Sequence, residues 1–203
     1  MEYEKEKEIK KLKFNVIVLG EQSVGKTSII SRLKGKEFED TTLSTAGIDY
    51  YIDDKIIEGV KYKFKIFDTA GQERYKSIAG STIKLADGFI IVFAIDNKKS
   101  FEQVQYWINR VEEEVDLSKK PLILVGNKMD LERVVPKDDV DNFTKPKFLK
   151  YLETSAKTGN NIREIFDTLY NDIFQLNSQA KETFSVRKMK QPEKKKRNSF
   201  SLC

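Results

Sequence analysis

The segment at residues 20–27, Gly-Glu-Gln-Ser-Val-Gly-Lys-Thr, constrains this chain more than any other. It follows a largely apolar run at residues 14–19 and precedes an amphipathic run at residues 29–33, so a strand, a tight loop and a helix are predicted in succession. In such a loop the glycines let backbone N–H groups point at phosphates, the lysine reaches the terminal phosphates, and the hydroxyl can hold Mg²⁺. The alternative is a chance match in an ordinary turn, which the flanking strand and helix disfavour. We therefore predict a phosphate-binding loop.

Composition excludes several kinds of chemistry. The 203 residues are 39% hydrophobic and 34% charged, which suits one globular domain with charged extensions. There is no histidine, so Ser-His-Asp triads, histidine metal sites and a histidine general base are excluded. The one cysteine, Cys203, excludes an intramolecular disulfide. We find no apolar run long enough for a membrane span and no signal-peptide core, and expect a cytosolic protein.

The net charge of +5 is concentrated near the end of the chain. Residues 187–197 hold seven basic residues and one acidic residue, which leaves the rest of the chain close to neutral. No basic folded face is implied, and we expect no nucleic-acid partner. We divide the chain into a charged N-terminal extension (1–11), a folded domain (12–177) and a disordered basic tail (178–203).

Strand and helix patterns alternate through the folded domain. Residues 50–57 and 60–67 flank Glu58-Gly59 and predict an antiparallel edge hairpin, whereas the wholly apolar runs at 89–95 and 122–125 predict buried parallel strands. A helical pattern at 101–115, opened by a capping box at Ser100, and another at 162–174 supply covering helices. The prediction is a doubly wound α/β domain with its ligand at the carboxyl ends of the strands.

Three further motifs each follow a predicted strand: Asp-Thr-Ala-Gly-Gln-Glu-Arg-Tyr at 68–75, Asn-Lys-Met-Asp at 127–130, and Ser-Ala-Lys at 155–157. Asp68 can meet Mg²⁺ through a water, and the Gly71 N–H can bond a terminal phosphate oxygen. The Asp130 carboxylate matches the adjacent N–H donors of guanine, a pair that adenine lacks. Alone, either aspartate could merely cap a helix. Their order and their positions at strand ends favour one nucleotide site.

With these motifs, the chain resembles the Rab family of small GTPases over residues 12–176. Further matching segments are Ser-Thr-Ala-Gly-Ile-Asp-Tyr at 44–50, Lys-Phe-Lys-Ile-Phe at 63–67 and Glu-Thr-Ser-Ala-Lys at 153–157. The resemblance implies a P-loop NTPase small G domain, with a six-stranded, mostly parallel sheet, one antiparallel edge strand and helices on both faces. Ala46 and Phe67 depart from the family pattern on the effector-facing surface.

The resemblance also implies GTP or GDP and Mg²⁺ as ligands. Thr27, Thr45 and Asp68 would bind the metal, directly or through water, and Gln72 would orient the attacking water. Asn127 and the Ala156 N–H would hydrogen-bond to the base. Lys128 would lie along the base, and Phe38 would stack across it. The expected nucleotide-binding residues are Gly20, Gln22, Ser23, Val24, Gly25, Lys26, Thr27, Ser28, Phe38, Thr45, Gly71, Asn127, Lys128, Asp130, Ser155, Ala156 and Lys157.

The resemblance implies a monomeric switch in vesicle trafficking that hydrolyses GTP slowly. Its expected partners are an exchange factor, a GTPase-activating protein, effectors and a GDP-dissociation-inhibitor type chaperone. Lipidation of Cys203 beside the basic cluster would place it on the cytoplasmic face of an endomembrane; a solvated charge run and a nuclear-localisation patch are alternatives for that cluster. Alternative functions are a Ras- or Rho-branch signalling GTPase, a nucleotide-dependent binding module with negligible hydrolysis, and a P-loop kinase or ATPase.

Overall fold

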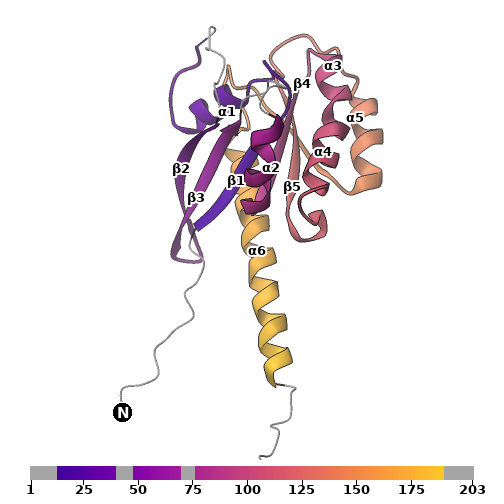
Figure 1. Cartoon of the computed structure of the whole chain (residues 1–203). Coiled ribbons are helices and arrows are strands. Elements are labelled where there is room, and N and C mark those ends of the chain that lie inside the picture. Colours follow the sequence, from indigo (N-terminus) through magenta and orange to yellow (C-terminus); the bar gives the residue numbers. More distant parts are fainter. Residues whose placement is uncertain (1–12, 40–47, 70–75, 190–203) are drawn as a thin grey trace, which may run out of the picture.

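The computed structural model describes residues 13–39, 48–69 and 76–189 (Figure 1). Its strands are β1 (Lys13–Leu19), β2 (Ile48–Ile57), β3 (Val60–Thr69), β4 (Gly88–Ala94), β5 (Leu122–Asn127) and β6 (Lys150–Glu153). Its α-helices are α1 (Lys26–Leu33), α2 (Lys76–Leu85), α3 (Lys98–Glu102), α4 (Val104–Glu112), α5 (Lys137–Thr144) and α6 (Ile162–Met189). Two short 3-10 turns, η2 (Leu117–Lys119) and η3 (Lys145–Lys147), precede β5 and β6.

The six strands form one sheet in the order β2-β3-β1-β4-β5-β6. Only the β2–β3 pair is antiparallel, and the other four pairs are parallel. This confirms the predicted edge hairpin and the six-stranded, mostly parallel sheet. Because parallel strands all end at the same edge, the segments that follow β1, β3, β5 and β6 come together there.

Helices cover both faces of the sheet, and the side chains of β1 show why both faces are buried. Phe14, Val16 and Val18 pack in a core cluster with α1 and α6, whereas Ile17 and Leu19 pack on the other face with α2, α4 and α5. Alternate side chains of a strand point to opposite faces, so an apolar strand such as this one is buried on both. Helix α6 continues past the amino-terminal edge of the sheet (Figure 1).

One helical prediction needs correction. The pattern at 101–115 is not one helix opened by Ser100: it is divided into α3 and α4 at Gln103, and Asn97 caps α3 by accepting a hydrogen bond from the Ser100 N–H at 3.2 Å. The Ser100 hydroxyl is instead buried and accepts a bond from the Ala94 N–H at 3.0 Å, which ties α3 to the end of β4. Helix α6 extends to Met189, past residue 177, where we placed the end of the folded domain.

No helix in the described ranges has both the length and the apolar character needed to span a bilayer.

Candidate nucleotide site

The loop that we expect to bind phosphate begins directly after β1 and leads into α1, as the strand–loop–helix prediction required. Gly20 and Gly25 have φ angles of 137° and 95°, a region that side chains disfavour. A Cβ on Gly20 would lie 2.1 Å from the Val92 carbonyl oxygen, and one on Gly25 would lie 2.3 Å from Asn127 Nδ2. Glycine is therefore required at both positions, because any other residue would have a strained backbone and its Cβ would clash with a neighbour.

Helix α1 begins at Lys26, and its N-cap residue, Gly25, makes no side-chain capping hydrogen bond. The first N–H groups of a helix lack intrahelical partners and carry a partial positive charge. An uncapped N-terminus beside a glycine loop is suited to a phosphate. Within the loop Val24 is buried, Gln22 and Ser23 are exposed, and Ser28 in α1 is half-buried.

Lys26 is the charged centre of the loop. Its side chain is buried, and Nζ donates to the backbone carbonyls of Gly20 at 2.9 Å and Glu21 at 2.8 Å. Burial lowers the pKa of Lys26 from 10.5 to about 8, against the opposing charges of Asp68 and Glu21. An anion at the loop would stabilise the ammonium form.

Asp68 lies beside this lysine near the end of β3. The register of the sheet places it opposite Val18 of β1, next to the start of the loop. Burial raises the pKa of Asp68, while a hydrogen bond from the Thr27 side chain and the charge of Lys26 oppose that rise. Its buried Oδ1 has no hydrogen-bond partner within the described part of the chain.

The side chains of Asp68 and Thr27 fit a magnesium ion. A buried carboxylate oxygen without a partner is costly, and a hard cation held by carboxylate, hydroxyl, phosphate and water oxygens would satisfy it. The described residues contain no cluster of three or more acidic, histidine or cysteine side chains, so a metal here would depend on phosphate and water for its other ligands.

Asn127 connects the two halves of the site. Its buried amide donates from Nδ2 to the Val24 carbonyl at 2.8 Å, and Oδ1 accepts bonds from Thr154 Oγ1 at 3.1 Å and from the Ala156 N–H at 3.2 Å. The phosphate loop is thus tied to the segment after β6. The resemblance assigned Asn127 and the Ala156 N–H to the base; here they bond to each other, and their base-reading role stays a prediction.

The other expected base contacts follow β5 and β6. Ser155 Oγ donates to Asp130 Oδ1 at 2.5 Å, which fixes the orientation of an otherwise exposed carboxylate. Lys128 has a φ of 67° and lies 3.4 Å from Asp96 Oδ2, while Lys157 is exposed. Phe38 is half-buried against the core cluster of α1 and α6.

The remaining predicted residues, Thr45, Gly71, Gln72 and Cys203, lie outside the described residues.

Sequence reasoning missed three neighbours of the site. Asp96 follows β4 and pairs with Lys128, so the strand-end rule that identified Asp68 could have identified it. Thr154 is fully buried and bonds to Asn127. Trp107 of α4 donates from Nε1 to Glu21 Oε1 at 3.0 Å. A buried indole N–H needs an acceptor, but the sequence does not say which one.

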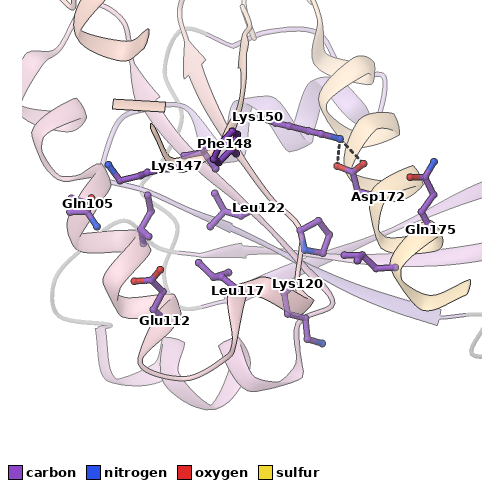
Figure 2. Close-up of a pocket in the computed structure, with 14 residues that line it drawn as sticks. Gln105, Glu112, Leu117, Lys120, Leu122, Lys147, Phe148, Lys150, Asp172 and Gln175 are labelled. Atoms are coloured by element: carbon purple, nitrogen blue, oxygen red, sulfur yellow. Dashed lines mark hydrogen bonds and ion pairs between the residues drawn. The ribbon is translucent and has the colours of Figure 1, made fainter. Parts of the chain in front are cut away.

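A hollow of about 560 Å³ lies at the opposite edge of the sheet, at the amino ends of β5 and β6 (Figure 2). Ile108, Leu122 and Leu176 are among the side chains that line it, and Lys150 and Asp172 are paired at 2.6 Å on its rim. None of the described residues that line this hollow belongs to the predicted nucleotide site.

Comparisons with known proteins agree with this arrangement. Residues 15–175 match the Ras family model. The chain is 40% identical to Ras-related protein Rab-13 of Bos taurus over 162 residues, which is 79% of each protein. It is 38% identical to Ras-related protein Rab-8 of Diplobatis ommata over 188 residues (90% of this chain and 89% of the relative), and 38% identical to Rab-10 of the same species over 166 residues (81% and 82%).

The sheet order, the loop at the end of β1 and the extent of these matches point to one conclusion: the chain belongs to the Rab family of small GTPases, which hydrolyse GTP and act in membrane trafficking.

Proposed function

We propose that this GTPase is a magnesium-dependent switch whose nucleotide spans the carboxyl edge of the sheet, with the phosphates on the loop at 20–27 and guanine between Asn127 and Lys157. The observation that carries the proposal is the environment of Lys26, a buried ammonium group that bonds to carbonyls beside an uncapped helix N-terminus. Nucleotide phosphates would pair with this ammonium group and with the first N–H groups of α1.

Selection of guanine is assigned to Asp130. Its carboxylate is oriented by Ser155 and can accept two N–H donors from the base edge. A base that lacks those donors would leave the carboxylate unpaired, so discrimination against adenine of about 10⁴ is attainable without any editing step.

Magnesium is assigned to Thr27 and Asp68, with Thr45 as a further hydroxyl. When bound, it would neutralise charge on the phosphates. Thr45 would reach the metal only while the third phosphate is present, so its segment would be held with GTP and released with GDP.

Hydrolysis is assigned to Gln72, which would orient the attacking water. The sequence has no arginine between Phe38 and Ile48 to supply positive charge to the reacting phosphates. We expect slow turnover by the isolated protein and an acceleration of about 10³- to 10⁵-fold by a GTPase-activating protein that brings an arginine.

Partner choice and membrane attachment complete the proposal. An exchange factor would load GTP, effectors would bind the GTP form, and a GDP-dissociation-inhibitor type chaperone would extract the GDP form. The basic residues at 187–197 and a lipid on Cys203 would hold the protein on the cytoplasmic face of an endomembrane, with each basic residue near the surface adding about 1 kcal/mol.

Single-turnover hydrolysis tests the switch. Protein loaded with radiolabelled GTP should hydrolyse it slowly alone and rapidly with a Rab-type activating protein, and an activator lacking its arginine should not accelerate it. Turnover near 1 s⁻¹ (on the order of activator-stimulated GTPases) by the protein alone would contradict the inference that the isolated protein lacks a cation to stabilise the reacting phosphates. For the tail, the intact mass of membrane-bound protein from a eukaryotic host should include a lipid, and an unmodified Cys203 would refute lipid anchoring there.

A further inference from the structure

The hydrogen bond between Trp107 and Glu21 joins the core to the phosphate loop across 86 residues of sequence. Trp107 lies on α4, is 5% exposed, and packs with the core cluster on that face of the sheet. Glu21 is half-buried and is the second residue of the loop. An indole N–H can only donate, and a buried donor that loses its acceptor is costly. The bond therefore favours one position of the Glu21 side chain.

Glu21 also holds Lys26. Its backbone carbonyl accepts from Lys26 Nζ at 2.8 Å, beside the Gly20 carbonyl at 2.9 Å. The side chain of Glu21 is thus held by Trp107 of α4, while the backbone carbonyl of Glu21 holds Lys26, the lysine that we expect to contact phosphate.

We propose that Trp107 is a positioning residue for the phosphate loop and that its bond to Glu21 slows the release of bound guanine nucleotide. The inference depends on the proposed phosphate-binding role of the loop. Loss of the bond would free the Gly20-Glu21 backbone, and Lys26 would then lose the geometry in which it meets the phosphates. Binding would still occur, but with a shorter lifetime.

Release of fluorescent GDP into excess unlabelled GDP, with magnesium present, measures this lifetime. Trp107→Phe removes the N–H while keeping an aromatic ring, and Glu21→Ala removes the acceptor. Each should speed release about tenfold, and the double variant should be no faster than either single variant because both remove the same bond. Glu21→Gln keeps an acceptor oxygen but replaces a charged acceptor with a neutral one, so its GDP release should be faster than that of the unmodified protein and slower than that of Glu21→Ala.

Val111→Ala is the matched control. Val111 is fully buried on the same helix in the same core cluster, so its truncation should lower the melting temperature without changing GDP release. The inference is overturned if Trp107→Phe releases GDP no faster than Val111→Ala, or if the effects of Trp107→Phe and Glu21→Ala multiply in the double variant.

Two further measurements separate the possible failures. If Lys26→Met leaves GDP binding intact, the phosphate role of the loop is wrong; if Lys26→Met abolishes binding while Trp107→Phe has no effect, only the positioning role is wrong. Trp107 is the single tryptophan of the chain, so its emission reports on this contact directly. Glu21→Ala should shift that emission, and identical spectra would contradict the bond.

Discussion

The two ends of the proposed nucleotide site differ in how completely the protein's own residues pair their buried polar and charged groups. At the base end, Asn127, Thr154, Ser155 and Ala156 are buried and bond to one another or to their neighbours. At the phosphate end, burial shifts the pKa of Lys26 downward and that of Asp68 upward, and an Asp68 oxygen lacks a partner among the described residues.

This difference indicates separate roles. The end that we assign to the base is preorganised, since its residues already bond to one another, and it would contribute selectivity. The end that we assign to the phosphates keeps desolvated charges that a magnesium nucleotide would stabilise, so it would contribute affinity. Variants at the two ends should therefore change different quantities.

The largest effect is expected from Asp130→Asn. The amide replaces one acceptor with a donor, which suits the base edge of xanthine better than that of guanine. The preference for GDP over XDP should fall by about 10⁴-fold, while the magnesium dependence of binding stays unchanged. Competition between the two nucleotides for a fluorescent analogue measures this, and unchanged selectivity would refute the assignment of the base.

At the other end, Lys26→Met should lower GDP affinity by about 10³-fold and leave the preference for GDP over ATP unchanged, because a buried charge-assisted contact is lost. Isothermal titration with each nucleotide measures both quantities. A variant that retained full affinity would show that this lysine does not meet the phosphates.

The pH dependence of stability sharpens the comparison further. The pKa of Lys26 is about 8 in the folded protein and near 10.5 when unfolded, so between these pH values the unfolded chain binds more protons. The free energy of unfolding of nucleotide-free protein should therefore gain roughly 3 kcal/mol from Lys26 as the pH rises through this window. Urea unfolding measures it, with Lys26→Met as the control that lacks this contribution. An equal slope in both proteins would contradict the shifted pKa.

The smallest effect is expected from Thr154→Val. Thr154 Oγ1 is one of two donors to Asn127 Oδ1, and the Ala156 N–H remains when it is removed. GDP release should accelerate about tenfold or less. Stopped-flow release at several magnesium concentrations provides the test, and a change in the magnesium dependence would show that the two ends are not separate.

The sequence predicted the parts of the site that depend on local pattern. The loop at 20–27 has a fixed spacing. Asp68 lies near the carboxyl end of β3 and Asp130 follows β5, and these strand ends must meet at one edge of the sheet. Alternation in residues 60–67 likewise predicted the edge hairpin that β2 and β3 form.

The parts that the sequence did not predict depend on side-chain directions between distant segments. The bond from Asn127 to Val24 spans 103 residues, and neither partner carries a local signal for the other. The division between α3 and α4 escaped prediction because the apolar period continues through Gln103, while Ser100 turns inward to bond with β4.

Equilibrium binding of fluorescent GDP, with and without EDTA and with GTP or ATP as competitor, tests the central claim most directly. If a preorganised guanine pocket is joined to a charged phosphate end, binding will be tight, will weaken when magnesium is removed, and will be reversed by GTP but not by ATP. Displacement by ATP at the same concentration as GTP, or binding indifferent to magnesium, would contradict it.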